Sequence, residues 1–291
     1  MLSGNSRARI NWPEPIGEER LLRGENCVNV IEAVAFMPNT PTLIGDLGVD
    51  HKDTIAALRS LGKEIAGKID AVVIMTPHFQ TSGSFGVVGT ERLRQIFDFY
   101  GFPPEFYEAR YEPPGDPQLA EQIINLGKDT GIRIGQAGNW GLDHGAWSPL
   151  FHIFKDADVP TVPLSICPDL GYQAHIAIGR QMRSQSIKNN LCVLSTGSLI
   201  HRLDLFQAGN KRTPPKAMEY LDICISSFKE GKWDSIWNAP SDLVGAASPE
   251  GYNLPLRFIQ GVVGDRFRAR ILANEVEFNA ASLTTAIFEE A

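Results

Sequence analysis

The sequence predicts an α/β fold in which a central mixed β-sheet is covered by helices, and three observations support this prediction. Strand-like and helix-like segments alternate along most of the chain. The strand-like segments are continuous apolar runs, which is typical of strands buried on both faces of a sheet. No linker divides the 291 residues, which suffice to bury a substantial core. We therefore expect one α/β domain.

The expected strands are short runs rich in β-branched and other apolar residues. The last of them alternates between apolar and polar side chains, as an edge strand does. The predicted strands cover residues 29–37, 70–77, 84–90, 161–167, 191–198 and 266–278.

The expected helices are segments with apolar residues at helical spacing. The second of them begins at an Asp cap, Asp116, and ends at Gly131. Residues 1–28 are polar and interrupted by prolines, and we interpret them as an N-terminal extension before a domain of residues 29–291. The predicted helices cover residues 49–69, 116–131, 171–190 and 213–238, the last as one or two helices, and a further helix begins within residues 252–265.

Composition excludes several classes of function. The net charge is −7 and the isoelectric point is near 5.4, without a dense run of lysine and arginine, so we expect no nucleic-acid partner. No apolar run is long enough to span a bilayer, and no secretory signal is visible. The four cysteines are widely spaced and form no CxxC pair, which favours reduced thiols in a cytoplasmic protein.

Three of the six histidines stand where α/β folds place their functional sites. His78 ends a buried strand, His201 follows another, and His144 lies in a predicted loop beside an aspartate. Side chains at the carboxyl ends of neighbouring strands converge at one edge of the sheet. Imidazole serves both as a metal ligand and as a general acid or base near neutral pH. The other histidines, His51, His152 and His175, fall in or beside predicted helices and are expected to have packing or surface roles.

These residues alone support two classes of protein. One is a metal-dependent enzyme that uses histidine and carboxylate ligands. The other is a metal-independent hydrolase or binding protein with a histidine-lined pocket. A serine hydrolase is the weaker form of the second class because no GxSxG elbow follows a strand. A nucleotide cofactor has no support, since GxGxxG and GxxxxGK[ST] are absent.

Three segments of the sequence favour the metal-dependent class. They are "IFDFYGFPPEFYEARYEPPGDPQLAEQI", "NWGLDHGAWSPLF" and "TPHFQT". Together they resemble the class III (LigB-type) extradiol ring-cleavage dioxygenases, and the first two are most similar to the DOPA-dioxygenase-like branch. The resemblance runs from about Ala33 to Gly264.

The resemblance implies a LigB-like single domain that holds one non-haem Fe(II), or zinc in some relatives. Its ligands would be two histidines and one carboxylate, an arrangement that leaves positions open for a catecholate and O2. By position, His78 matches the second histidine ligand and Glu250, in "AASPEGYNLPLRFIQG", matches the carboxylate. His201 matches the acid–base histidine, and His144 matches a histidine that lines the substrate pocket.

The first ligand position departs from this pattern. In the loop "MPNTPTLIG", Asn39 stands where the family has a histidine. An amide oxygen is common around Ca²⁺ but is not among the ligands expected for Fe(II). Three readings follow: an active dioxygenase with an atypical Asn39–His78–Glu250 site, a metal-free or repurposed enzyme, or a non-catalytic subunit of a hetero-oligomer. The favoured cofactor is Fe(II), with zinc or no metal as alternatives.

The expected substrate is a small catechol- or aminophenol-like aromatic, with O2 as co-substrate. Aromatic side chains beside the histidines are candidates to line its pocket. Arg110 or Arg202 is a candidate to receive a substrate carboxylate, although a surface role is the default for both. A homo- or hetero-oligomer is expected. The predicted substrate-binding residues are Asp143, Phe79, Tyr100 and Trp147, with Phe99 and Phe102 as further aromatic candidates.

Overall fold

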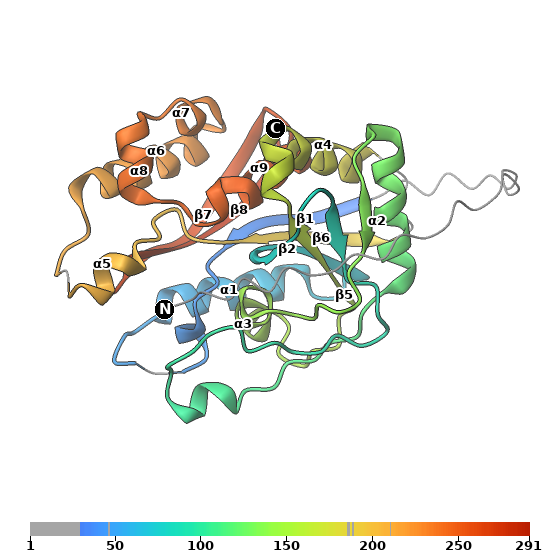
Figure 1. Ribbon diagram of the computed structural model, residues 1–291, viewed down its shortest axis with the longest axis horizontal. Helices are drawn as coiled ribbons and strands as arrows, with labels where there is room; N and C mark the ends of the chain where they lie inside the picture. The colour runs from blue at the N-terminus through green and yellow to red at the C-terminus, as the bar shows by residue number, and fades with distance from the viewer. Residues whose placement is uncertain (1–29, 46, 185–186, 188, 210) are drawn as a thin grey trace, which may run out of the picture.

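A computed structural model of the chain describes residues 30–45, 47–184, 187, 189–209 and 211–291. The expected N-terminal extension, residues 1–28, lies outside the described residues. The described chain forms a layered α/β structure with one sheet between two sets of helices (Figure 1).

The strands of the described residues form one mixed sheet in the order β4-β3-β5-β2-β6-β1-β8-β7, which confirms the predicted fold class. The four central strands β5, β2, β6 and β1 are parallel. On one side β3 pairs antiparallel with β5, and on the other β8 pairs antiparallel with β1 and with β7. The strands are β1 (Val30–Met37), β2 (Ala71–Gln80), β3 (Phe85–Val87), β4 (Ile134–Gln136), β5 (Thr161–Ile166), β6 (Asn190–Thr196), β7 (Phe267–Glu277) and β8 (Ala281–Glu290).

The central strands of the sheet are buried on both faces, which explains their continuous apolar runs. Successive residues of β2 belong to different cores: Val73 and Met75 pack on one face, whereas Val72 and Ile74 pack on the other. All four side chains are fully buried. A strand that is covered on both faces needs apolar residues at every position and not only at alternate ones.

Two groups of helices cover the two faces. In Figure 1, α1 and α3 lie on one face of the sheet, and α4 and α9 lie on the other, beside α6 and α8. The helices are α1 (Lys52–Ile65), α2 (Pro117–Thr130), α3 (His144–Ile153), α4 (Gly171–Ser184), α5 (Leu203–Gln207), α6 (Pro215–Glu230), α7 (Asp234–Trp237), α8 (Ser241–Ala247) and α9 (Leu254–Val263). Short 3₁₀ turns are η1 (Pro41–Leu43), η2 (Pro104–Tyr107), η3 (Pro168–Leu170) and η4 (Glu250–Asn253).

Helix α2 shows how local sequence sets an element. The Asp116 side chain caps it by accepting a hydrogen bond from the Leu119 amide at 2.9 Å. Gly131 ends it in the left-handed conformation, with a φ of 68°. Both boundaries agree with the prediction, because capping oxygens and left-handed glycines are local signals.

Two predicted features are wrong in detail. His144 was expected in a loop, but it is the first residue of α3, which Gly145 and Pro149 had obscured because both residues disfavour helices. The predicted helix over residues 171–190 does not reach its expected end, because α4 is described as Gly171–Ser184 and Asn190 already belongs to β6. In addition, β8 was not anticipated: its buried stretch carries several serine and threonine side chains and lacks a simple apolar pattern.

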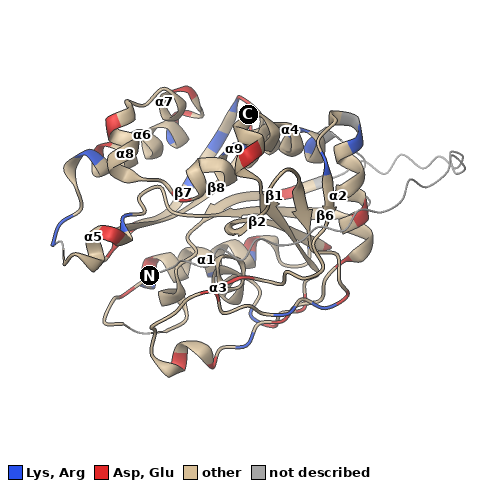
Figure 2. Cartoon of the chain, in the orientation of Figure 1, with Lys and Arg blue, Asp and Glu red and all other residues tan. Residues whose placement is uncertain are grey.

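Charged side chains are distributed over the molecule without segregation by sign. Figure 2 shows lysine, arginine, aspartate and glutamate interspersed along the helices and outer loops. Among the described residues, the helices are all too short or too polar to traverse a bilayer.

Candidate active site

The candidate residues meet where the parallel strands end. Asn39 follows β1, His78 lies near the end of β2, and His201 follows β6. Because β1, β6 and β2 are adjacent and parallel, their carboxyl ends share one edge of the sheet. Glu250 reaches the same place from η4, and His144 from the start of α3.

Glu250 contacts three of the predicted site residues. Its Oε1 lies 3.2 Å from Nε2 of His78 and 3.8 Å from Nε2 of His201. Its Oε2 accepts a hydrogen bond of 3.0 Å from the amide Nδ2 of Asn39. The structure thus brings Asn39 and His78, two of the predicted metal positions, each into contact with the third, Glu250.

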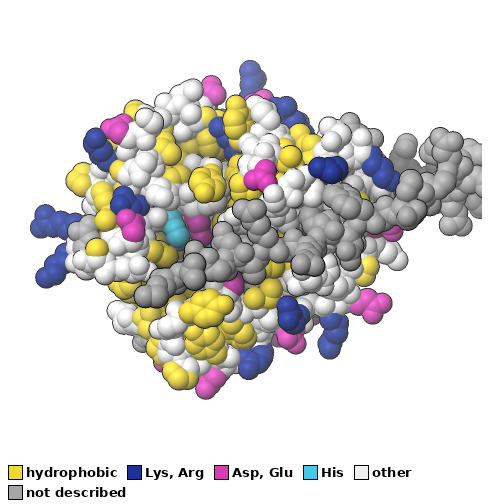
Figure 3. Space-filling view, in the orientation of Figure 1, with side chains coloured by type: hydrophobic (Ala, Val, Ile, Leu, Met, Phe, Trp, Pro, Cys, Tyr) yellow, Lys and Arg dark blue, Asp and Glu magenta, His cyan; other side chains and the backbone are white. Residues whose placement is uncertain are grey.

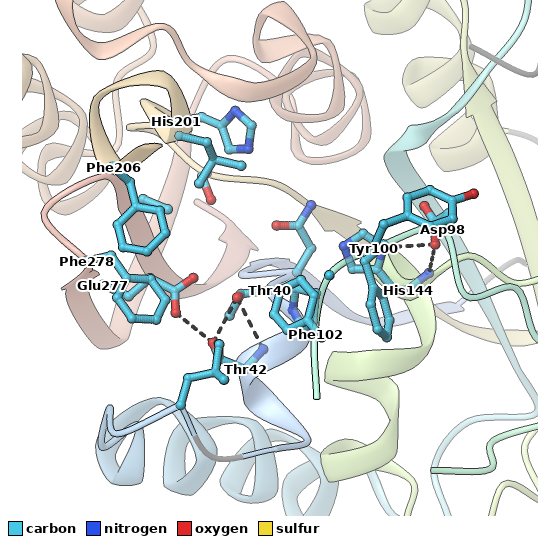
Figure 4. Close-up of a pocket in the computed structure, with 18 of the residues that line it drawn as sticks. Thr40, Thr42, Asp98, Tyr100, Phe102, His144, His201, Phe206, Glu277 and Phe278 are labelled. Atoms are coloured by element: carbon cyan, nitrogen blue, oxygen red, sulfur yellow. Dashed lines mark hydrogen bonds and ion pairs between the residues drawn. The ribbon is translucent and has the colours of Figure 1, made fainter. Parts of the chain in front are cut away.

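A residue that was not predicted, Asp98, joins the two histidines on the other side. Its Oδ2 lies 3.0 Å from Nδ1 of His78, and its Oδ1 lies 2.8 Å from Nδ1 of His144. The backbone amide of His144 also donates to Oδ1, at 2.8 Å. The two imidazole rings meet edge to face, with 4.2 Å between their centroids. Figure 4 shows Asp98 beside His144.

The sequence carried one signal for Asp98. It is the acidic residue inside the aromatic phrase "IFDFYGFP", of which only the aromatic members were considered. A carboxylate in such an apolar run is costly to bury unless it is paired. That cost makes an isolated Asp among aromatic residues a candidate partner for histidine or metal.

The charges of these groups depend on one another. Burial of the His78 ring opposes its protonation, but hydrogen bonds to Asp98 and Glu250 outweigh this and hold the pKa of His78 well above 6.5. Burial raises the pKa of Glu250, yet the charge of His201 and the contact with His78 lower it to about 2. Contacts with His144 and His78 lower the pKa of Asp98 in the same way against its burial. Without a metal, His78 is therefore a cation between two carboxylates.

The side chains of His78 and Glu250 are common ligands of divalent metal ions, and the amide of Asn39 is a weaker one. Nε2 of His78 and the carboxylate of Glu250 are ligand types that Fe(II) and zinc accept. The bond from Nδ1 of His78 to Asp98 is the carboxylate–histidine arrangement that orients metal-binding imidazoles. Asn39 offers an amide oxygen only after its amide rotates, because Nδ2 faces Glu250.

A second grouping uses the other nitrogen of His78. Among the described residues, His78, Asp98 and His144 offer ligand atoms that all lie within 4.8 Å of one another. In that grouping His78 would bind through Nδ1, the atom already hydrogen-bonded to Asp98. Since one imidazole cannot orient itself on Asp98 and bind metal through the same atom, the two groupings are alternatives.

Two glycines allow this close packing. A Cβ at Gly145, in the first turn of α3, would lie 2.8 Å from Cδ2 of His78. Gly251 follows Glu250 with a φ of +56°, and a Cβ there would lie 2.8 Å from Cβ of Pro77. A side chain at either position would displace His78 or Glu250.

The site opens into two cavities. One has a volume of about 570 Å³ and a mostly apolar wall, and the other has a volume of about 600 Å³ and a more polar lining. Figure 3 shows a histidine and an acidic side chain exposed next to each other in this face, with apolar side chains gathered nearby. Of the residues that the structure describes, five line both cavities: His78, Asp98, Tyr100, His201 and Glu250.

Only one of the four predicted substrate-binding residues lines these cavities. Tyr100 does, with 86% of its surface exposed. Asp143 is fully buried and accepts hydrogen bonds from Thr76 and Trp140. The other two residues are buried as well: Phe79 stacks on Trp140, and Trp147 donates to the carbonyl of Ile96. These three residues are therefore part of the buried packing around the site and do not contact the cavities.

The remaining candidates lie away from the centre. His152 contacts the Leu43 carbonyl at 2.6 Å, and His175 is a fully buried residue of α4. Arg110 donates to backbone carbonyls, and Arg202 pairs with Asp204. Neither arginine lines either cavity.

Comparison with known proteins identifies similar sequences. The family model described as "Catalytic LigB subunit of aromatic ring-opening dioxygenase" matches residues 34–289. This match extends beyond the expected range of resemblance at its C-terminal end and includes β8.

Curated proteins and a solved structure agree with that match. A protein from Beta vulgaris named 4,5-DOPA dioxygenase extradiol is 26% identical over 84% of this chain and 92% of its own length. An Escherichia coli K12 protein of the same name is 32% identical, over 46% of this chain and 48% of that protein. The crystal structure of an uncharacterized Escherichia coli K12 protein superposes with a TM-score of 0.63 at 22% identity, covering 88% of this chain and 99% of that one, which supports the fold.

Proposed function

The chain belongs to the LigB family of aromatic ring-opening dioxygenases, and from this membership we propose that it is an extradiol-type dioxygenase for a small catechol- or aminophenol-like aromatic. The observation that carries the proposal is the contact of His78, Glu250 and Asn39 at the junction of two cavities. We also propose that residues 29–291 form a single functional domain. The cytoplasmic location and the oligomeric state stay predictions.

We propose that Nε2 of His78 and the carboxylate of Glu250 hold a ferrous ion, with Asn39 at the third position. Such an ion supplies open coordination positions and the redox chemistry that ring opening requires. Asp98 keeps the His78 ring in place by holding its Nδ1, 3.0 Å away. Because Nδ1 of His78 is held there, its Nε2 is the nitrogen that faces Glu250.

His201 is the proposed acid–base group. Its side chain is 34% exposed and lines both cavities, and its Nε2 lies 3.8 Å from Oε1 of Glu250. In this proposal it takes a proton from a substrate hydroxyl and returns one to the product.

His144 is the proposed substrate-positioning group. Its Nδ1 and backbone amide are both bound to Asp98, which leaves Nε2 as the ring nitrogen available for a hydrogen bond to a substrate oxygen. Its fixed ring would orient that oxygen toward the site.

The Asn39 contact favours a second candidate function, a metal-free enzyme that uses the same side chains for proton transfer. The amide of Asn39 donates to Glu250, and His78 bridges Glu250 and Asp98. In this network His78, Glu250 and Asp98 all have hydrogen-bond partners without a metal. Such a set of linked acids and bases could pass protons to and from a substrate.

The experiment that separates the two functions is anaerobic reconstitution with Fe(II), followed by addition of catechol and air. Stoichiometric iron and a yellow ring-fission product are expected for the dioxygenase. A Glu250→Gln variant should bind less iron and form no product. A protein that binds neither iron nor zinc at excess would overturn the first proposal and leave the metal-free enzyme.

A further inference from the structure

We propose that the substrate is a hydroxylated aromatic ring that carries an apolar substituent and no carboxylate. This inference rests on the proposed ring-opening function and names the substrate class for that same site. It follows from the size, the wall and the charge of the cavities that adjoin His78 and Glu250.

The apolar cavity is larger than the ring alone requires. A cavity of roughly 150 Å³ holds a benzene-sized ligand. The cavity on this side of the site has a volume of about 570 Å³. A catechol bound at His78 would therefore leave most of this volume for a substituent.

The far part of the cavity is built for an apolar group. Phe206 of α5 and Phe278 after β7 contact each other with 4.8 Å between ring centroids and 37° between the ring planes, although Phe206 is 47% exposed. Leu203 lies one turn before Phe206 and is 42% exposed. Figure 4 shows Phe206 and Phe278 together on one side of the cavity and Phe102 and Tyr100 on the other. Exposed apolar side chains that face each other across a cavity indicate a ligand that covers them.

The charges around the site disfavour a carboxylate. Among the described residues that line the two cavities, there is no lysine or arginine. Asp98 and Glu250 line both, Glu277 lines the apolar one and Asp169 the polar one. A substrate carboxylate would face these like charges in a partly dehydrated space.

The three histidines that line the cavities all lie against these carboxylates, His201 at 3.8 Å from Glu250. His78 and His144 are each paired with Asp98, and His78 also contacts Glu250. The arginines that were considered for a carboxylate are occupied elsewhere: Arg202 donates to both oxygens of Asp204, at 2.9 and 2.8 Å, and Arg110 to backbone carbonyls.

The geometry thus assigns an orientation to the substrate. The ring hydroxyls lie at His78, His201 and Glu250, and the substituent extends along the wall formed by Phe206 and Phe278. Phe206 is a specificity residue in this arrangement, because it contacts the substituent and is far from the hydroxyl end of the ring.

The test is binding, measured by anaerobic isothermal titration calorimetry on the full chain after loading with Fe(II). Three probes are compared: catechol, tert-butylcatechol and dihydroxybenzoate. We expect tert-butylcatechol to bind at least about tenfold more tightly than catechol, because its added methyl groups are buried. Dihydroxybenzoate should bind more weakly than catechol.

Variants of Phe206 sharpen the test. Phe206→Ala should weaken tert-butylcatechol binding about tenfold and change catechol binding little. Phe206→Arg should improve dihydroxybenzoate binding relative to catechol, since it adds the missing cation. The control is Tyr172→Ala, which removes a half-exposed aromatic residue that lines neither cavity and should change none of the affinities.

The outcomes separate this inference from the proposed function. If catechol binds and dihydroxybenzoate binds more tightly than tert-butylcatechol, the substrate class is wrong and the ring-opening proposal stands. An unchanged preference in both Phe206 variants also overturns the class. If none of the probes binds, the proposed function itself fails and the inference fails with it.

Discussion

Asn39 is the residue that makes the activity of this family member a question, because it replaces the histidine expected as the first metal ligand. Its side chain sits beside Glu250 and is 5% exposed, so it is not an idle turn residue. Asn39→His should raise the affinity for Fe(II) at least about tenfold, because even partners outside the ligand set change affinity by that factor. Competition with a metal chelator measures this affinity.

The matched control is Asn39→Ala, which removes the amide without adding an imidazole. It should give no gain in affinity. If Asn39→His also gives none, the position is not a ligand position in this chain. Loss of a native activity in Asn39→His would instead show that the amide itself is required.

Asp98 links two histidines from different elements, and its removal should affect both. Asp98→Asn replaces charge-assisted hydrogen bonds to His78 and His144 with weaker ones. We expect a 10–100-fold loss of metal affinity, the usual cost of losing such a supporting partner. Asp169→Asn, in the polar cavity, is the control and should leave metal affinity unchanged. Equal affinities of the wild type and Asp98→Asn would show that the ring of His78 is oriented by other contacts.

At the scale of the element, η4 holds Glu250 next to a run of residues with left-handed backbone conformation. Gly251, Tyr252 and Asn253 all have φ values between 56° and 59°. Gly251→Ala should lower the free energy of unfolding by about 2 kcal/mol, because alanine is strained in this conformation and its Cβ would meet Pro77. Chemical denaturation measures the loss.

Gly245 of α8 provides a matched comparison. A Cβ there meets nothing within 4 Å. Gly245→Ala should therefore stabilise the protein by up to about 1 kcal/mol through helix propensity. A similar response of both glycines to alanine would mean that η4 relaxes without cost.

Helix α4 contains a histidine that makes stability depend on pH. His175 is fully buried, its Nδ1 lies 2.7 Å from the Gly171 carbonyl, and its Nε2 accepts from the Cys167 amide. Burial lowers the pKa of His175 from 6.5 to about 4, although the bond to Gly171 opposes this. The unfolded chain therefore binds a proton at higher pH than the native one, and stability is lost as pH falls from about 6.5 toward 4.

A His175→Gln variant tests this dependence. The linkage amounts to about 3 kcal/mol between pH 7 and pH 4 for a shift of this size. Denaturation of both proteins across that range should show a smaller decline in the variant. Parallel curves would show that other groups cause the acid sensitivity. Above pH 7 the two slopes should agree, because His175 is neutral in both states.

The elements that sequence predicted well are those with local or strongly periodic signals. The caps of α2 and the apolar run of β2 are such cases. Helix α3 was missed because Gly145 is needed for contact with His78 and Pro149 is tolerated by tertiary packing. At such positions tertiary packing overrides the low intrinsic helix propensity of the residue.

The site was predictable only where a motif marked it. His78 and Glu250 match the family pattern, Asn39 departs from it at the position that the motif marks, and the structure brings both His78 and Asn39 against Glu250. Phe206 and Phe278 lie far apart in sequence and reach the cavity through α5 and the end of β7. No motif links them, so their proximity is visible only in the folded chain.

At the scale of the whole molecule, the reactivity of the buried cysteines measures how often the core opens to solvent. Cys167, Cys192 and Cys224 are fully buried, and burial raises the pKa of the Cys224 thiol to about 12. In a Cys27→Ser variant, a thiol reagent should react with these three only as fast as the protein unfolds. Mass spectrometry at increasing denaturant follows the reaction. Rapid labelling of any one of them in the native protein would reveal a local opening of the core around that cysteine.

The order of strands has a consequence for how the protein is made. β1 lies between β6 and β8, so the first described strand pairs with the last. During synthesis β1 leaves the ribosome long before either neighbour exists, and one edge stays open until residues 281–290 emerge. The sheet can be completed only after residues 281–290 have emerged, and the nascent chain presents an unpaired apolar strand edge until then. Chaperones that shield such strands would therefore be needed most by the ribosome-bound chain.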